Sequence, residues 1–391
     1  MSQNPEKKGL CEAGEGGELD ALRIEDRDVL VYGSGLAAES LLRALVEDGR
    51  HVLAVVDDHP RARPQVCGHD VIRTRPEIWA DCGESPVLLG VFNRGVSPLA
   101  LSARLRKQGA ARIISYPAAV HALPMLKGTY CLQSATHGAL PPVEALHATR
   151  SLLRDARSMA LWDANIEMRR SGHYSRALDP DASTQYMDLS VAGWEMPKNY
   201  CAVDGGAYDG GSIDEWIAGG LTPGRVLAFE PDPENFEKLS SRLRAFRRAH
   251  AVEGFAWPSG LGSANGMQRF SGGAGEASRI DDGGDTTISV VVGDDVVAGA
   301  RVDLIKLDVE GAEPDALLGL RRTIREWQPL LAISAYHTMA HIWELPSLIN
   351  SIEPGYRFDL RSHGHHGMDL VLYGVPSSMA NHKNLPDGGS S

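Results

Sequence analysis

Two glycine turns, each directly after a short apolar run, constrain the fold of this chain more than any other feature. Val29–Tyr32 leads into GSG at 33–35, and YCAV at 200–203 leads into DGG at 204–206. A helical pattern and a further apolar run follow each turn. This order is typical of parallel sheets covered by helices on both faces. The sequence therefore predicts an α/β protein with two Rossmann-like units.

Composition and patterning divide the remainder of the chain. At 391 residues the chain is too long for one ordinary core. A helical pattern over Val143–Arg170 predicts a connector between the two units. The predicted parts are a flexible tail (1–27), a first Rossmann-like unit (28–124), the helical connector (125–195), a second unit (196–378) and a second flexible tail (379–391).

The net charge and the cysteines exclude several classes of protein. A formal net charge of −12 argues against binding to nucleic acid or to an anionic membrane. No apolar run approaches the roughly 20 residues of a membrane span, and the start of the chain lacks a signal-peptide pattern. Five scattered cysteines with no C-x-x-C pair suit a reducing compartment. We therefore expect a cytoplasmic protein.

The second glycine turn, VDGGAYDG at 203–210, places an acid where a phosphate-binding turn would have none. Glycine lets a ligand approach the backbone, and a carboxylate suits an ammonium better than a pyrophosphate. S-adenosylmethionine carries both an ammonium and a sulfonium. The turn therefore predicts that Asp204, Gly205, Gly206 and Gly210 bind the amino-acid end of this cofactor. The alternative is that Asp204 and the later acid Glu230 are both ordinary loop acids.

The next strand, Val226–Phe229, ends at Glu230, 24 residues after Gly206. This is close to the roughly 20-residue spacing at which an acid meets ribose hydroxyls in nucleotide-binding α/β folds. Pro231 then stops the strand. We expect Glu230 to accept the ribose hydroxyls, with Pro231 beside it.

A third segment, DLIKLDVEGAE at 303–313, interrupts an apolar strand with Lys306 and follows it with acids. A buried lysine needs a carboxylate partner. Asp308 and Glu310 lie at the predicted strand end, in line with the other two strand ends, and predict the floor of a reaction site. Glu313 is predicted only to match the dipole of the following helix.

Together, VDGGAYDG, AFEPDPENFEKL and DLIKLDVEGAE resemble the FkbM family of S-adenosylmethionine-dependent methyltransferases, from about Gln185 to Pro376. The resemblance implies a class I methyltransferase fold with a mostly parallel sheet. It also implies O-methylation of a small-molecule acceptor, such as a sugar, a polyketide or another natural product.

The resemblance also suggests catalytic residues. It places His337 at the end of the strand Leu330–Ala335, facing the substrate, and His363 is a further candidate downstream. Candidate bases are Asp308 and His337, because a hydroxyl nucleophile must lose its proton.

Lys306 is predicted to orient Asp308 or to neutralise developing oxyanion charge. In the minority alternative, Asp308 and Glu310 hold Mg²⁺, which then acidifies the hydroxyl.

The first glycine turn, with Asp57 at the next strand end, also suggests a nucleotide site. The segment from Val29 to about Pro124 resembles the small amino-terminal domain of bacterial sugar acyltransferases. This implies that residues 28–124 bind a nucleotide-sugar or serve assembly, and we expect a homodimer. The alternative function is an NAD- or nucleotide-sugar-binding protein without methyltransferase activity.

Overall fold

The computed structural model describes residues 19–377 except 24, 61, 127–139, 189–190, 192–194, 272–278 and 281–282. It divides into two compact units, residues 1–92 with 96–123 and residues 93–95 with 124–391. Most of the predicted tail 1–27 and the whole of the predicted tail 379–391 lie outside the described residues.

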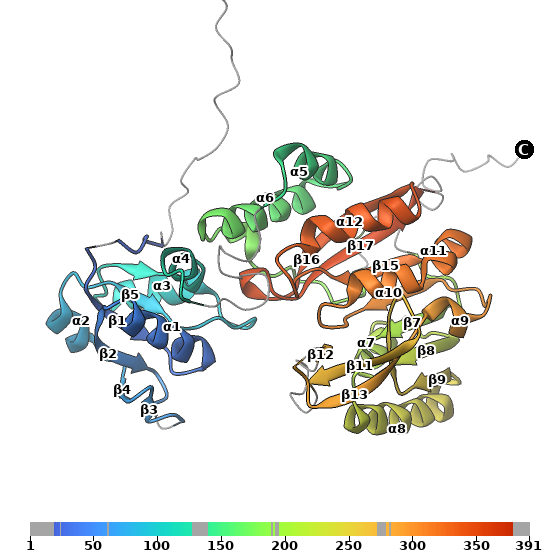
Figure 1. The fold of residues 1–391 in the computed structure, drawn as a ribbon, viewed down its shortest axis with the longest axis horizontal. Helices are drawn as coiled ribbons and strands as arrows, with labels where there is room; N and C mark the ends of the chain where they lie inside the picture. The colour runs from blue at the N-terminus through green and yellow to red at the C-terminus, as the bar shows by residue number, and fades with distance from the viewer. Residues whose placement is uncertain are drawn as a thin grey trace, which may run out of the picture. The chain divides into compact units, whose positions relative to one another are not determined.

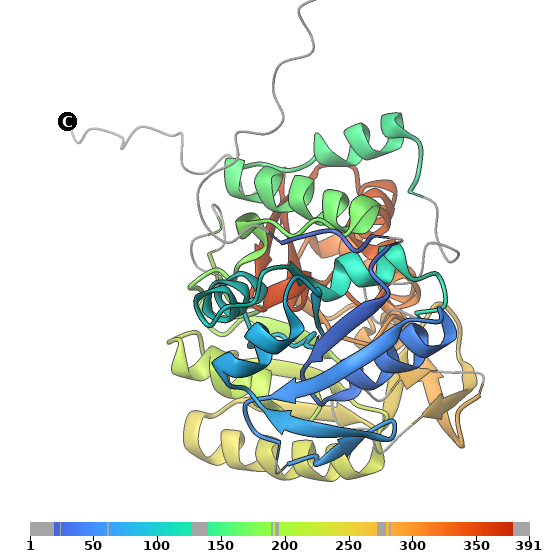
Figure 2. The ribbon, with the colours of Figure 1, turned by 90° about the vertical axis from the view of Figure 1, so that its left-hand side faces the viewer.

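The first unit is a mainly parallel sheet with helices on both faces (Figure 2). One face of the sheet, with Leu30 and Tyr32, packs against Trp79 and Leu105, which come from two different helices. The first helix of the unit buries its own leucines, Leu41, Leu42 and Leu45. The strands, in the order β3-β4-β2-β1-β5-β6, are β1 (Asp28–Tyr32), β2 (His51–Asp57), β3 (Gln65–Val66), β4 (His69–Arg73), β5 (Val87–Leu89) and β6 (Ile113–Ile114). The helices are α1 (Leu36–Glu47), α2 (Pro76–Cys82), α3 (Pro98–Lys107) and α4 (Tyr116–Ala122).

The described end of the predicted amino-terminal tail is part of this unit. The N–H of Asp20 donates to the carbonyl of Ile113 at 2.8 Å, and Arg112 pairs with Asp26 at 2.6 Å. The expected flexible tail 1–27 is therefore too long, because residues 20 and 26 bond to the strand β6 and to the residue before it.

The second unit is built on a seven-stranded sheet in the order β16-β17-β15-β14-β7-β8-β9 (Figure 1). Its strands are β7 (Cys201–Gly205), β8 (Arg225–Phe229), β9 (Glu253–Trp257), β14 (Leu304–Leu307), β15 (Leu330–Ser334), β16 (Tyr356–Ser362) and β17 (Leu370–Pro376). The strand β17 runs antiparallel to both of its neighbours, β15 and β16. Chain order reverses between β7 and β14, which is where open α/β sheets bind ligands.

Apolar side chains cover both faces of this sheet, as expected for buried parallel strands. One face packs on Trp216 and Leu243 of α7 and α8. The helices are α7 (Gly211–Ala218), α8 (Pro233–His250), α9 (Gly293–Val297), α10 (Glu313–Gly319), α11 (Arg321–Trp327) and α12 (His341–Ile352). The predicted α/β fold with a mostly parallel sheet is confirmed.

The predicted helical stretch Val143–Arg170 consists of two helices, α5 (Val143–Arg150) and α6 (Ala156–Ser171). Between them, Leu153 forms a β-bridge with Phe358 of β16, and Asp155 caps α6 by accepting the N–H of Ser158 at 2.7 Å. The short helix η1 (Arg176–Leu178) follows α6. In Figure 1, α6 lies beside β16.

A second, four-stranded sheet lies between β9 and β14 in the chain and was not predicted. Its order is β10-β13-β11-β12, with β10 (Ser259–Leu261), β11 (Gly266–Ser271), β12 (Arg279–Ile280) and β13 (Thr286–Val291). Among the described residues, no helix has the length and apolar character needed to cross a bilayer.

Candidate functional site

A pocket of about 430 Å³ opens at the carboxyl ends of β7, β8 and β14. Side chains of the predicted motifs line it, together with residues of the second sheet and of the segment before β7. Of the predicted site residues, those that line the pocket are Gly206, Glu230, Pro231, Lys306, Asp308 and Glu310. The lining does not include Asp204, Gly205, Gly210, His337 or His363.

Gly206 forms the inner wall of the turn. Its φ is +67°, and a Cβ at this position would lie 1.9 Å from the carbonyl oxygen of Asp308. The N–H of Gly206 donates to the carbonyl of Phe229. Gly210, at φ +88°, is the N-cap of α7, while Gly205 ends β7 beneath the pocket. Only glycine permits the close approach of the turn to β14 at position 206.

Asp204 lies behind this turn. It is completely buried, and its carboxylate receives Lys306 Nζ at 2.9 Å and Ser212 Oγ at 2.6 Å. The sequence predicted that Asp204 binds the ammonium of the cofactor and that Lys306 serves Asp308. In the structure the ammonium on Asp204 is that of Lys306, which also donates to the carbonyl of Gly206 at 2.7 Å.

Glu230 faces the pocket at the end of β8. Its Oε2 accepts the N–H of Tyr208 at 2.8 Å, and its Oε1 accepts the N–H of Asp232 at 2.9 Å. The pKa of Glu230 is raised, because the effect of burial outweighs these two hydrogen bonds, which lower it. Each carboxylate oxygen has a second lone pair, so Glu230 can still accept hydrogen bonds from two hydroxyl groups.

The acids that follow β14 surround His337. Its Nδ1 lies 2.8 Å from Oε1 of Glu313, and its Nε2 lies 3.3 Å from Asp308 and 3.6 Å from Glu310. Glu313 also accepts the N–H groups of Val309 and Gly311. Glu313 was predicted only to match a helix dipole, but it is buried and fixes both the loop and the imidazole.

These contacts decide the charge states. Burial lowers the pKa of His337, but the charges of Glu313, Asp308 and Glu310 outweigh this and raise it well above its usual value. Burial raises the pKa of Asp308, but His337 and Lys306 outweigh this and hold it well below its usual value. In this arrangement His337 is already protonated, which leaves Asp308 as the better of the two predicted bases.

Tyr186 is a pocket residue that sequence reasoning missed. Its backbone has φ +59°, its hydroxyl lies 2.9 Å from Ser334 Oγ, and Lys306 Nζ lies 5.2 Å from the centre of its ring. Burial and the charge of Asp308 raise the pKa of Tyr186 well above its usual value, so the phenol stays neutral. The only sequence signal is an aromatic residue within a polar turn.

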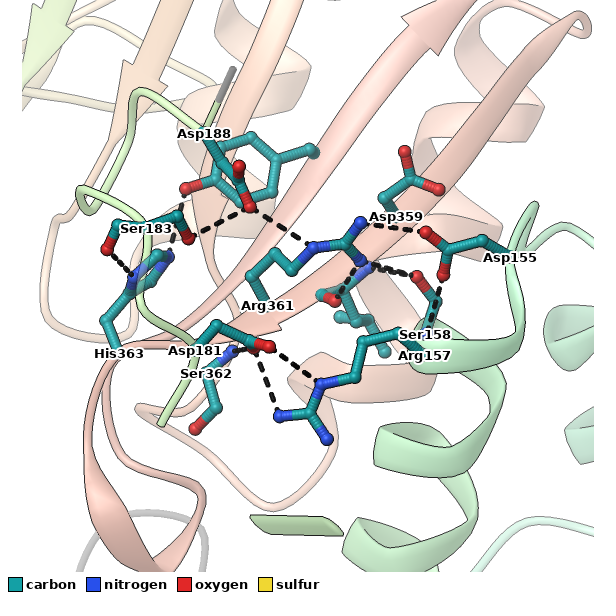
Figure 3. Close-up of polar contacts among 12 residues, drawn as sticks. Asp155, Arg157, Ser158, Asp181, Ser183, Asp188, Asp359, Arg361, Ser362 and His363 are labelled. Carbon is teal, nitrogen blue, oxygen red and sulfur yellow. Dashed lines mark hydrogen bonds and ion pairs between the residues drawn. The ribbon is translucent and has the colours of Figure 1, made fainter. Parts of the chain in front are cut away.

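A buried polar network holds the segment that carries Tyr186 (Figure 3). Arg361 of β16 pairs with Asp155 at 2.8 Å and with Asp188 at 3.2 Å. Asp181 accepts the N–H of Ser362 at 2.9 Å. The segment 181–188 is therefore tied to the end of β16 on both sides of Tyr186.

His363 belongs to this network rather than to the pocket. Its Nδ1 lies 3.2 Å from the carbonyl of Ser183, and its Nε2 lies 3.1 Å from the hydroxyl of Tyr373 (Figure 3). Burial lowers the pKa of His363. The structure thus does not bring His363 together with Asp308 and His337, and a direct catalytic role for it has no geometric support.

Two arginines of the pocket were also missed as site residues. Arg242 of α8 pairs with Asp209 of the glycine turn at 3.0 Å. Arg94, in the segment 93–95 that belongs to the second unit, pairs with Asp369 at 3.0 Å.

The first glycine turn has a simpler environment. Gly33 has φ +111°, and a Cβ there would meet the carbonyl oxygen of Gly90 at 2.8 Å. Ser34 Oγ donates to Asp57 at 2.7 Å, so the acid predicted for a nucleotide already has a partner. A nucleotide or nucleotide-sugar at this turn stays a prediction, as does a homodimer.

Comparison with known proteins supports the family predicted for the second unit. Residues 204–365 match the family model of the methyltransferase FkbM domain. The chain is similar to a solved methyltransferase FkbM from Methylobacillus flagellatus KT, with a TM-score of 0.72, 23% identity and coverage of 90% of each chain. At this identity the likeness shows the fold.

A solved precorrin-6y C5,15-methyltransferase from Geobacter metallireducens GS-15 is more distant. Its TM-score is 0.31 at 12% identity, over 50% of this chain and 94% of that one. Among curated proteins there is no match to the chain. The predicted family resemblance is confirmed over residues 204–365, whereas the likeness of residues 28–124 to sugar acyltransferases stays a prediction.

Proposed function

We propose that the protein transfers the methyl group of S-adenosylmethionine to a hydroxyl of a small molecule. The match of residues 204–365 to the family model of the methyltransferase FkbM domain supports this proposal. The observation that carries the proposal is the pocket where Gly206, Glu230 and Asp308 meet at three strand ends. A sugar, a polyketide or another secondary metabolite is the proposed class of acceptor.

The residues present fit the cofactor. Gly206 lines the pocket without a side chain, so a ligand can approach the backbone of the turn closely. Glu230 offers a carboxylate with capacity for two ribose hydroxyls, and a carboxylate would repel a 2′-phosphate. Apolar side chains of the second sheet, Leu261, Phe270 and Ile288, line the same pocket and suit the flat face of a base.

S-adenosylmethionine, when bound, supplies a methyl group on a positively charged sulfur. Asp308 is the residue that we assign to the acceptor: its ionised carboxylate accepts the hydrogen bond of the hydroxyl and takes the proton as the oxygen gains the methyl group. His337 and the charge of Lys306 lower the pKa of Asp308 and keep it ionised. Tyr186, neutral and above Lys306, closes this side of the pocket.

Calorimetry on the full chain with S-adenosylhomocysteine, NAD and UDP-glucose tests the proposal. We expect binding of S-adenosylhomocysteine, and weaker binding in Glu230→Gln. Transfer of labelled methyl from S-adenosylmethionine to a panel of hydroxylated small molecules then tests the reaction. Binding of NAD or UDP-glucose without S-adenosylhomocysteine would favour the alternative, a nucleotide-binding protein without methyltransferase activity.

A further inference from the structure

Asp308 and Glu310 at the pocket floor, together with the buried His337 beside them, have the spacing of ligands around one metal ion. The Nε2 of His337 lies 3.3 Å from Asp308 Oδ1 and 3.6 Å from Glu310 Oε1, and the three ligand atoms lie within 4.8 Å of one another. Adjacent ligands bound at about 2.0–2.2 Å to one ion lie about 3.0–3.6 Å apart. A small adjustment of the carboxylates would complete this geometry.

Glu313 orients the imidazole of His337 for metal binding, because it holds the ring nitrogen that faces away from Asp308 and Glu310. Glu313 accepts from Nδ1 at 2.8 Å and is itself fixed by the N–H groups of Val309 and Gly311. The side chain of His337 is 2% exposed, and within the described part of the chain its Nε2 has no hydrogen-bond partner. A carboxylate on the remote ring nitrogen is the usual support of a metal-binding histidine.

The local charge favours a cation. Three carboxylates, on Asp308, Glu310 and Glu313, surround one imidazole, while the ammonium of Lys306 is matched by Asp204. Even a protonated imidazole therefore leaves the cluster with excess negative charge. A divalent cation would balance it.

The cluster is also open to ligands. Asp308 and Glu310 line the pocket, and Glu310 also lines an adjoining cavity of about 230 Å³. A second group of possible ligands, Glu313, His337 and His341, is completely buried and internally paired, with Glu313 between the two imidazoles. Only the first group can take an ion and keep coordination positions open to the pocket.

We propose that Asp308, Glu310 and His337 bind a divalent cation of the Mn²⁺ class at the floor of the pocket. Carboxylate oxygens suit Mg²⁺ and Mn²⁺, whereas imidazole suits first-row transition metals, and Mn²⁺ belongs to both sets. The open positions face the space for the acceptor, so an acceptor oxygen is the natural further ligand. This role rests on the proposed function, whereas the binding of the cation does not.

Titration of the chelator-treated full chain with Mn²⁺, followed by electron paramagnetic resonance and calorimetry, tests the site. We expect one Mn²⁺ per chain, bound at least about tenfold more weakly in Glu310→Gln and in His337→Gln. The matched control is Asp315→Asn, an exposed acid on the same side of the pocket but outside the cluster, which should bind as the wild type does.

Absence of Mn²⁺ binding, or equal binding in wild type and Glu310→Gln, overturns the proposal. Circular dichroism checks each variant, and if His337→Gln fails to fold, the more exposed Glu310→Gln decides. Calorimetry with S-adenosylhomocysteine on the same samples separates the two proposals. Binding of S-adenosylhomocysteine without binding of Mn²⁺ would contradict the metal site alone. Binding of Mn²⁺ without binding of S-adenosylhomocysteine would support the metal site and contradict the proposed function.

Discussion

The ammonium of Lys306 lies 2.9 Å from a carboxylate oxygen of Asp204, and the two residues stand opposite each other in the ladder between β14 and β7. Both side chains are buried. Burial lowers the pKa of Lys306, but Asp204 and Asp308 outweigh this and raise it, so the ammonium stays charged. Because Lys306 also holds the carbonyl of Gly206, the pair ties two strand ends to the glycine turn.

Breaking this pair should destabilise the protein strongly. Asp204→Ala leaves a buried ammonium without its counter-ion, which costs about 3–5 kcal/mol. The double variant Asp204→Leu/Lys306→Met should cost less, because no charge is left buried. Urea unfolding gives these free energies. Glu253→Ala is the control, since it breaks an exposed pair with Arg225 in the same sheet and should cost no more than about 1 kcal/mol. A single variant as stable as this control would show that the pair does not hold the sheet.

Gly206→Ala should damage both stability and the cofactor pocket. A Cβ at position 206 meets the carbonyl oxygen of Asp308 at 1.9 Å, so the turn has to move away from β14. Gly220→Ala is the matched control, because Gly220 also has a positive φ, +82°, but has open space around it. The control should lose about 1–2 kcal/mol from the left-handed backbone alone. We expect a larger loss in Gly206→Ala, with weaker S-adenosylhomocysteine binding; equal effects would mean that the turn can shift freely.

The sequence predicted the parts of the site that follow strand ends. Glu230 and Asp308 each come directly after an apolar run, and parallel strands bring their carboxyl ends to one edge of the sheet. The partner of Lys306 was not predictable, because it depends on the register between strands about 100 residues apart. Tyr186 was missed for a similar reason, since its place depends on contacts with Lys306 and Ser334 far along the chain.

The same limit applies to the fold. The alternation of strands and helices predicted the main sheet, whereas the second sheet consists of strands as short as Ser259–Leu261 whose pairing is not local. The break between α5 and α6 arises at the bridge of Leu153 to β16, about 200 residues later, where Phe358 donates to the carbonyl of Leu152 and accepts the N–H of Arg154. Local pattern cannot reveal a helix end that a distant strand imposes.

Cofactor affinity should depend on pH through Glu230. Burial raises the pKa of this carboxyl above its ordinary value. Because the ionised form accepts hydroxyl protons, S-adenosylhomocysteine should bind more weakly as the pH falls toward this pKa, and the loss should begin at a higher pH than for an ordinary glutamate. Glu230→Gln should cost about 1.5–3 kcal/mol at neutral pH and flatten this dependence. Calorimetry across the acidic range measures both effects.

Protonation of Glu230 should affect the stability of the fold in the opposite direction from cofactor affinity. A carboxyl whose pKa is raised in the folded state favours the folded protein in its protonated form, so protonation of Glu230 does not itself destabilise the fold. Thermal unfolding at each pH provides the control. If affinity and stability fall together at the same pH, or if Glu230→Gln retains the wild-type profile, Glu230 is not the group that binds the ribose.

Asp308→Asn should lower methyl transfer while cofactor affinity survives, because the proposed function assigns Asp308 to the acceptor and Glu230 to the cofactor, and both line the pocket. A positioned general base contributes about 10²–10⁴-fold. Since His337 and Lys306 hold the pKa of Asp308 well below its usual value, its carboxylate is a weak base. We therefore expect a loss near the lower end, about 10²-fold.

Comparison with Glu310→Gln separates the two roles open to Asp308. As a proton acceptor, Asp308 cannot be replaced by added metal, so Asp308→Asn stays slow at saturating Mn²⁺ while Glu310→Gln recovers. As a metal ligand only, it behaves like Glu310, and both variants recover together. Turnover measured against Mn²⁺ concentration distinguishes these outcomes, and full activity of Asp308→Asn without added metal would remove Asp308 from the mechanism.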